Sequence, residues 1–224
     1  MRKSENPEIV RWGAVDRLTH WLLIIGVSFA VLTSLPSFDT RLFGWLSLPN
    51  VLARNLHLAS GMLLMAAALI HIVYRIVKPR KTRIFPSGKD FSDFGQIVRH
   101  WFDKSKPYPK LGFHHPVEKL DYWGLAVIGL LLTGVGGIML WFPGTFPPSY
   151  ATWAIVLTGI GFFIMATILV GHIIFALLPV NRPALKAMLL GRKVSAEWAK
   201  ENHPAWAEEL LGTSNPGSKK GKSR

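Results

Sequence analysis

The chain has 224 residues, of which 50% are hydrophobic and 12% aromatic, and it carries a formal net charge of +13 without a single cysteine. A positive mean hydropathy of +0.27 beside such a charge requires that apolar and charged residues occupy separate segments, which excludes a soluble enzyme. The lack of cysteine excludes disulfides, thiolate-bound iron–sulfur clusters and covalently attached c-type haem, so any metal must be held by histidine, methionine or oxygen ligands.

Long apolar runs follow a basic N-terminal segment at residues 1–17. Runs of about 20 uncharged residues match the thickness of a bilayer's hydrocarbon core, so the sequence predicts an all-α, integral membrane four-helix bundle. The first run is long and lacks a small-residue cleavage site, so we expect it to be retained as a span rather than removed as a signal peptide. The predicted spans are residues 18–35, 56–77, 122–142 and 152–178, which together form one membrane domain at 18–178.

Basic residues are distributed very unequally among the connections. Of the 26 Lys and Arg, 24 lie before the first span, after the fourth span, or in the connection between the second and third spans taken together with the end of the second span. By the positive-inside rule, both termini and the loop at 78–119 are predicted to be cytoplasmic, with the chain in a bacterial inner membrane. Because these charges flank apolar spans, we expect them to contact anionic lipid headgroups and not nucleic acid.

The loop at 78–119 contains a segment, residues 91–102, whose apolar side chains fall on one helical face. This pattern predicts an amphipathic helix in the cytoplasmic interface, facing either the membrane or a protein partner. The segment 179–210 is predicted to be a cytoplasmic C-terminal segment with a short surface helix at 184–191. The small, polar and basic residues 211–224 are predicted to be a disordered tail.

Four histidines fall within the predicted spans or one turn from their ends. Ionisable groups inside a membrane are costly, so their default interpretation is functional. Neutral imidazoles on opposing helices can ligate a haem iron from both sides. His20, His71 and His172 lie at similar depths near the cytoplasmic side, whereas His57 lies about 21 Å away from His71 in depth, at 1.5 Å rise per residue. We therefore predict that His20, His57, His71 and His172 are haem ligands and that the cofactor is haem b, with two haems per chain; for each residue singly, the alternative is an interhelical hydrogen bond.

A second group of polar residues precedes the third span, in the run GFHHPVEKLDYW. His115 and Glu118 are three residues apart and lie where water meets the apolar region. A quinone site needs an apolar slot near an electron carrier and groups that exchange protons with water. We predict that His115 and Glu118 form the catalytic site for quinone or menaquinone; the alternative is ordinary contact with headgroups.

Several motifs together resemble the membrane cytochrome b subunits of respiratory formate dehydrogenases and of nickel–iron hydrogenases, over residues 11–206. This resemblance implies four transmembrane helices that hold two b haems, with a quinone beside the cytoplasmic-side haem. It also implies that His20 and His172 ligate the inner haem and that His57 is one ligand of the outer haem. The motifs are RWGAVDRLTHW, LHLASG, the Thr133–Gly134 and Leu140–Trp141 pairs, His172 and GRKVSAEWAKENHPAW.

The sequence departs from that family in two respects. The family's second outer histidine corresponds to Thr158, and His71 is additional. His115 and Glu118 stand where the family has Asn and Gln. The HHPVEKLDYW run and the HLASG…LIH pattern are more similar to cytochromes b that pair with multihaem c-type cytochromes.

We therefore expect a dihaem b-type cytochrome, an electron-transfer subunit of a quinone-linked oxidoreductase complex. It would carry electrons between a periplasmic redox subunit, of the formate dehydrogenase or hydrogenase type with iron–sulfur clusters, and the quinone pool. One alternative is a quinol dehydrogenase that feeds a periplasmic multihaem cytochrome. Another is a haem-free anchor or a proton or metal transporter. The donor substrate, the direction of electron flow and the axial pairing stay open at this point.

Overall fold

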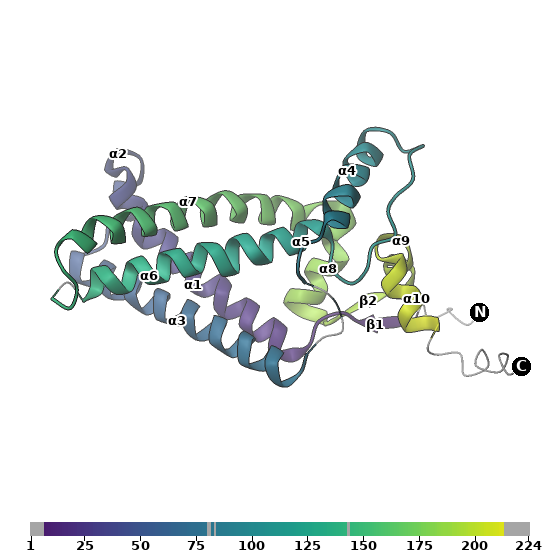
Figure 1. The fold of residues 1–224 in the computed structure, drawn as a ribbon, viewed down its shortest axis with the longest axis horizontal. Coiled ribbons are helices and arrows are strands. Elements are labelled where there is room, and N and C mark those ends of the chain that lie inside the picture. The colour runs from purple at the N-terminus through teal and green to yellow at the C-terminus, as the bar shows by residue number, and fades with distance from the viewer. Residues whose placement is uncertain (1–6, 80–81, 83, 143, 213–224) are drawn as a thin grey trace, which may run out of the picture.

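Four long helices form the body of the protein (Figure 1). The structure is a computed structural model that describes residues 7–79, 82, 84–142 and 144–212. All four helices are long and apolar enough to cross a membrane, which confirms the four predicted spans. They are α1 (Ala14–Phe38), α3 (Asn50–Val77), a continuous third helix made of α5 (Pro116–Asp121), the π-helical η2 (Tyr122–Gly129) and α6 (Leu130–Trp141), and α7 (Ser149–Leu177).

Each helix begins earlier than its predicted span. Hydropathy marks the residues that match the hydrocarbon layer, whereas the helices themselves continue past that layer. In α1, the carboxylate of Asp16 accepts a hydrogen bond of 3.0 Å from the backbone N–H of Gly13, which starts the helix well before the apolar run. The helix ends, in contrast, agree closely with the predicted ones at 77, 142 and 178.

The four helices pack as two pairs. α1 lies along α3, and α6 lies along α7, while the principal contact between the pairs joins α3 to α6. Glycines permit close approach within the second pair: a Cβ added at Gly136 would lie 2.6 Å from the carbonyl oxygen of Ala154, and one at Gly161 would lie 2.8 Å from the backbone nitrogen of Thr133. The interface between α6 and α7 is therefore tight, and the boundary between the pairs is looser.

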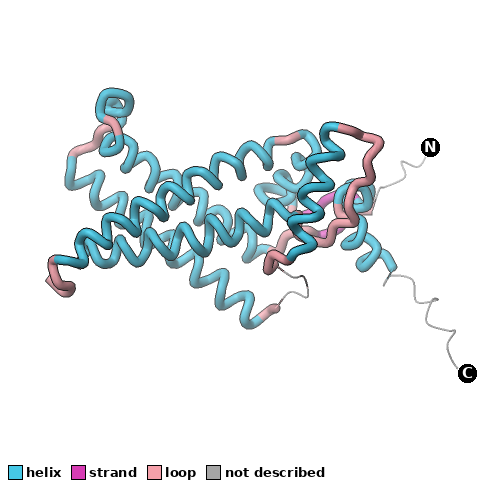
Figure 2. Tube along the Cα trace, turned by 45° about the horizontal axis from the view of Figure 1, so that its top comes forward, coloured by secondary structure: helices cyan, strands magenta, loops and turns pink. Residues whose placement is uncertain are grey.

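The connections divide between the two ends of the bundle (Figures 1 and 2). One end carries the short turn elements between α1 and α3 and the residues that join α6 to α7. The other end carries the two strands and the remaining short helices. The elements at the first end are α2 (Thr40–Phe43) and η1 (Gly44–Leu46), and those at the second are β1 (Glu8–Val10), α4 (Gly88–Phe102), η3 (Pro179–Asn181), α8 (Arg182–Lys186), η4 (Ala187–Gly191), β2 (Lys193–Ser195), α9 (Ala196–Asn202) and α10 (Pro204–Gly212).

A small two-stranded sheet joins the beginning and end of the described chain. β1 pairs antiparallel with β2, with Ile9 opposite Val194. The all-α prediction is therefore correct for the spans but missed this sheet, because three-residue strands leave no periodic signal in a sequence. The predicted helix at 184–191 is present as α8 and η4. Of the predicted tail, residues 211 and 212 end α10, and residues 213–224 lie outside the described residues.

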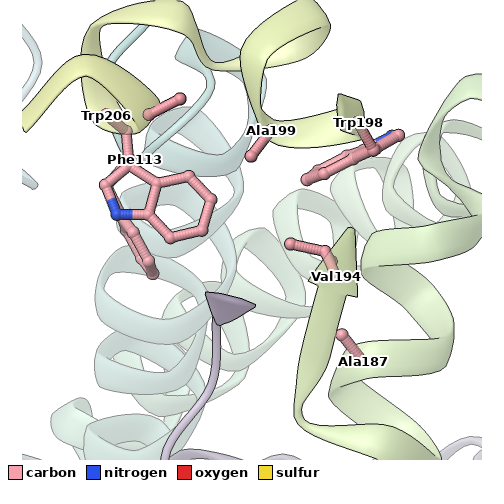
Figure 3. Packing of buried hydrophobic residues seen from close by; sticks show 7 residues of the cluster. Phe113, Ala187, Val194, Trp198, Ala199 and Trp206 are labelled. Atoms are coloured by element: carbon pink, nitrogen blue, oxygen red, sulfur yellow. The ribbon is translucent and has the colours of Figure 1, made fainter. Parts of the chain in front are cut away.

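We call residues 7–13, 111–115 and 179–212 the cap. Three segments that are distant in sequence share its apolar core, which Figure 3 shows from close by. Phe113 comes from the connection before the third span and packs edge-on against Trp206 with ring centroids 5.2 Å apart. The other buried members of this core are Ala187, Val194, Trp198, Ala199 and Ala207.

Arg11 lies at the centre of the cap. The charge count above grouped it with surface basic residues, but it is only 2% exposed. Its Cζ atom lies 5.1 Å from the ring centres of Phe113 and Trp198, and its Nη2 donates to Oε1 of Glu118 at 2.8 Å. Aromatic faces and one carboxylate thus replace the water that this cation gives up.

The cap is also fixed to the first span. Arg17 of α1 donates hydrogen bonds of 3.0 to 3.1 Å to the carbonyl oxygens of Met188, Leu189 and Leu190, at the end of η4. These carbonyls have no partner within their own helix, and a cation near a helix C-terminus is favourable. Arg17 therefore caps η4 and holds the cap against the start of α1.

Acid should weaken the cap through His203. Burial and the charge of Arg11 lower the pKa of His203 from 6.5 to about 3, and its Nδ1 lies 2.7 Å from the carbonyl oxygen of Gly112. Between those two pKa values the unfolded chain binds a proton that the folded cap does not. The free energy of cap unfolding should therefore decrease steadily as the pH is lowered from 6.5 towards 3. Hydrogen exchange of cap amides in the full chain, corrected for intrinsic rates, measures this.

The matched control for this measurement is His203→Asn, whose side-chain N–H can still reach Gly112. In this variant the free energy of cap unfolding should depend less on pH than in the wild type. The remaining dependence should come in part from His115, whose pKa burial lowers to about 4. Equal protection of wild-type cap amides at pH 7 and pH 4.5 would contradict the prediction.

Candidate functional site

The structure brings two of the four span histidines face to face. His20 of α1 and His172 of α7 have ring centroids 6.4 Å apart, with their planes inclined by 52°. The two rings come from different helix pairs, so they meet across the looser boundary of the bundle. Depth along the spans did not indicate whether His20 or His71 faces His172. In the structure the ring of His20 faces that of His172, and the ring of His71 lies beside that of Tyr122, with ring centroids 5.9 Å apart.

This spacing fits two axial ligands on one metal. An imidazole nitrogen lies about 2.0 Å from a bound metal and about 1.1 Å from its own ring centre, so two imidazoles on opposite sides of one metal have centroids about 6.2 Å apart. The 6.4 Å between His20 and His172 agrees with that geometry. In addition, the buried Nδ1 of His20 has no hydrogen-bond partner among the described residues.

A carboxylate orients the second ring. Nδ1 of His172 lies 2.9 Å from Oδ2 of Asp121. Since a carboxylate only accepts hydrogen bonds, Nδ1 carries the proton and Nε2 is left with its lone pair free for a metal. A carboxylate behind a ligating histidine fixes the ring and increases its basicity. Asp121 ends α5, directly before η2, and the sequence analysis did not single it out.

The donor set favours haem over a free metal ion. No cluster of three or more His, Asp or Glu side chains at metal-binding distance occurs among the described residues. A protein-only site for a transition metal commonly needs three or four such ligands. A porphyrin supplies four of the six ligands of its iron and needs only two side chains, which His20 and His172 can provide. The residues present therefore fit a haem.

His57 lies in a different environment. Its Nδ1 is 2.9 Å from Oγ1 of Thr33 and 3.4 Å from Oγ of Ser34, both on α1. Because the Thr33 hydroxyl already donates to the carbonyl oxygen of Phe29, it accepts from His57, which leaves Nε2 of His57 free. Thr158, at the expected position of the second outer ligand, has a buried hydroxyl that lies against Gly136 in the tight contact between α6 and α7.

The two residues predicted for the quinone site lie together at the start of the third span. His115 is the N-cap of α5: its Nδ1 accepts from the backbone N–H of Val117 at 3.1 Å, and Glu118 accepts from the backbone N–H of His115 at 3.1 Å. This reciprocal arrangement is a capping box, followed by a proline at the first helical position. The sequence HPVE contains its signature, which the sequence analysis did not recognise.

Each of these two side chains has a further partner. Glu118 forms the ion pair with Arg11 described above, which stabilises its ionised form. His115 is buried, and its ring lies 4.9 Å from that of Phe175. Burial lowers the pKa of His115 to about 4, although the nearby charge of Glu118 opposes that change. At neutral pH His115 is therefore an uncharged ring whose Nε2–H is a donor.

A third polar contact crosses between helices at the same end. Arg75, the one charged residue of the second predicted span, forms an ion pair with the buried Asp16 of α1. The pair joins the end of α3 to the start of α1. Arg75 therefore has a structural partner, and its presence inside a predicted span is explained.

Similarity to known sequences identifies the family of this chain. The sequence profile of the prokaryotic cytochrome b561 family matches residues 11–191. The cytochrome b556(Fdn) subunit of the nitrate-inducible formate dehydrogenase of Escherichia coli K12 is 26% identical over 215 residues, covering 92% of this chain and 94% of that protein. The cytochrome b556(fdo) subunit of formate dehydrogenase from the same organism is 27% identical over 223 residues, with 92% and 94% covered. The cytochrome b556 subunit of formate dehydrogenase of Haemophilus influenzae is 25% identical over 219 residues, with 93% and 86% covered.

These findings agree on the class of protein. A cytochrome b carries haem b in a membrane helix bundle, and this chain has four apolar helices and two facing histidines between them. The profile match covers most of the chain, including both histidines. The chain therefore belongs to the prokaryotic cytochrome b561 family, and it is a multi-pass membrane cytochrome of bacterial type that takes part in electron transfer.

Proposed function

We propose that this chain is the membrane subunit of a quinone-linked oxidoreductase complex, in which it transfers electrons between a periplasmic redox partner and the quinone pool. The observation that carries the proposal is the 6.4 Å between the rings of His20 and His172. A b haem held there supplies one-electron oxidation and reduction. His20 and His172 hold its iron, and Asp121 orients His172 through Nδ1.

His57 is the proposed ligand of a second haem. Thr33 binds Nδ1 of His57, as Asp121 binds Nδ1 of His172. In both histidines Nε2 is therefore the nitrogen available to a metal. Since Thr158 lies in a helix contact, His57 would be the one evident protein ligand of that site, and its partner would be a methionine, a residue of another subunit or nothing. His71, beside Tyr122, is the remaining candidate ligand.

The proposed quinone site uses His115 and Glu118 in different ways. His115 donates a hydrogen bond from Nε2–H to a quinone oxygen, and the carboxylate of Glu118, which Arg11 keeps ionised, accepts hydrogen bonds from the water at the boundary that exchanges protons with the quinone. Support comes from their position at the start of the third span, where His115 caps the helix that ends in Asp121 and Glu118 lies in its first turn. The Arg11 ion pair keeps Glu118 fixed within this site.

The charge distribution supports the orientation. The cap and the connection from 78 to 119 contain most of the basic residues and lie at one end of the bundle (Figure 1). By the positive-inside rule we assign this end to the cytoplasm of a bacterial inner membrane. The partner then binds at or near the other end. Because three similar proteins are formate dehydrogenase subunits, a partner of that type, with iron–sulfur clusters, is proposed first.

His172→Ala and His20→Ala should each remove the bis-histidine spectrum of the inner haem, since each takes away one of its two protein ligands. Reduced-minus-oxidised absorption spectra and a pyridine haemochrome assay of the purified protein measure the loss. His71→Ala is the matched control from the same depth and should retain this haem. A fully retained bis-histidine signal in His172→Ala would refute the assignment.

Asp121→Asn should raise the reduction potential of the inner haem. The carboxylate behind His172 makes the imidazole a stronger donor and favours the oxidised iron, whereas an amide is neutral. We expect the equilibrium constant for reduction to rise roughly tenfold, which equals about 59 mV for one electron. A spectroscopically monitored redox titration tests this, with the exposed Asp103→Asn as control; an unchanged potential in Asp121→Asn would assign Asp121 a packing role.

His115→Leu should slow quinone turnover at least roughly tenfold while leaving the haem spectra intact, because it removes one hydrogen-bond donor from the site. The wild-type pH profile of quinone turnover between 6 and 8 should show no step from His115, since its pKa is about 4.

Glu118→Gln alone would leave Arg11 buried without its counterion, so the double variant Arg11→Met/Glu118→Gln separates the catalytic role of Glu118 from its structural role. Normal turnover in both His115→Leu and the double variant would place the quinone site elsewhere.

A further inference from the structure

Helix α4 (Gly88–Phe102) runs across the direction of the four long helices. Both views show it at the cap end of the bundle and steeply inclined to the spans (Figures 1 and 2). Because the spans cross the bilayer, a helix in this orientation lies along the membrane surface and not through it. Its length of 15 residues is also too short to span the hydrocarbon core.

The two faces of α4 have different surroundings. Asp93 and Ile97 are buried against the protein. An ion pair of 2.6 Å between Asp90 and Lys119 fastens the first turn to α5. The aromatic side chains are more exposed: Phe91, Phe94, Trp101 and Phe102 are 65%, 39%, 45% and 90% exposed. Packing on the protein therefore covers one edge of the apolar face, at Ile97, and leaves its aromatic side chains largely uncovered.

The exposed aromatic face is continuous with the lipid-facing surface of the third span. Phe91 and Phe94 line a groove with Pro116 and Leu120, and Leu120 is itself exposed on α5. Just before α4, Phe85 lies against Trp123, with ring centroids 4.8 Å apart. Trp123 donates from its indole N–H to the carbonyl oxygen of Ile84 at 3.1 Å. Tryptophan with one apolar and one hydrogen-bonded side is typical of the level of lipid headgroups.

Basic side chains accompany the aromatic ones. Lys89 and Arg99 of α4, and Lys104 and Lys106 directly after it, are exposed. Lys89 forms an ion pair with Asp93 and Lys106 one with Asp103, whereas no ion pair of Arg99 or Lys104 is found among the described residues. Anionic headgroups attract basic residues near the membrane surface, and an amphipathic helix with aromatic and basic residues on separate faces is the usual form of an interfacial anchor.

We propose that α4 is an interfacial membrane anchor: its aromatic face, Phe91, Phe94, Trp101 and Phe102, lies in the boundary between headgroups and acyl chains, and Arg99, Lys104 and Lys106 bind anionic phospholipid headgroups. The occupant of this surface is lipid, because the surface continues that of the spans and its charge is complementary to anionic lipid. The anchor holds the connection that carries His115 at a fixed depth in the membrane. This proposal needs only that the chain is membrane-embedded, so it stands or falls independently of the haem and quinone assignments.

The absence of cysteine makes a direct test possible, since each introduced cysteine is the single labelling site of the full chain. Phe91→Cys and Phe102→Cys place a nitroxide spin label on the aromatic face, and Ser92→Cys places it on the neighbouring exposed, polar face. The labelled full-length proteins are reconstituted into vesicles of phosphatidylcholine with phosphatidylglycerol. Collision of each label with oxygen, which concentrates in lipid, is compared with collision with a water-soluble nickel chelate. Circular dichroism verifies that each variant is folded.

Labels at 91 and 102 should collide more with oxygen than with the nickel chelate, and the label at 92 should show the reverse. Nickel access at all three positions would overturn the proposal, because α4 would then lie in water. Shielding of 91 and 102 from both reagents would overturn it in favour of a protein partner. The double substitution Lys104→Gln/Lys106→Gln should lower the preference of the label at 102 for oxygen over nickel in the anionic vesicles but not in vesicles of pure phosphatidylcholine. If the substitutions change this preference equally in both lipids, or in neither, the lysines do not bind anionic headgroups.

Discussion

A polar group inside a bilayer has no water to bind, so every such group must find its partner within the protein, and this requirement organises the bundle. Two histidines of the spans accordingly form hydrogen bonds between helices. His57 joins α3 to α1 through Thr33, and His172 joins α7 to the end of α5 through Asp121. In each contact Nδ1 forms a hydrogen bond with the protein, and Nε2 keeps a lone pair that can bind a metal. The same requirement that fixes the helices thus also presents the imidazoles as ligands.

The sequence was sufficient for the number of spans but not for their pairing. Apolar runs identify four helices because the hydrocarbon thickness sets their length. Which helix packs on which depends on details such as the contact between Gly161 and Thr133, where the missing side chain of a glycine allows two backbones to approach. Depth along a span could group His20, His71 and His172, but only their rotation about three helix axes decides that the first and last face each other.

The polar end of the molecule was the harder part to predict. His115 and Glu118 were recognised as neighbours at the membrane boundary, yet their capping interactions depend on α5 beginning at Pro116, earlier than the apolar run. Arg11 was counted as a surface charge because nothing local to it predicts burial. Its environment comes from segments around Phe113, Trp198 and Trp206, and long-range contacts of this kind have no periodic signature.

The way the cap is assembled sets an order on biosynthesis. β1 is among the first parts of the chain to be made, but its partner strand β2 follows the fourth span. Arg11 likewise cannot be buried until Trp198 and Trp206 have been synthesised. The N-terminal segment must therefore stay open while the translocon inserts all four helices, and it closes only when both ends of the chain are on the same side of the membrane. A chain inserted with one span too few would have its β2 on the opposite side of the membrane from β1, so the cap can close only in a correctly inserted molecule.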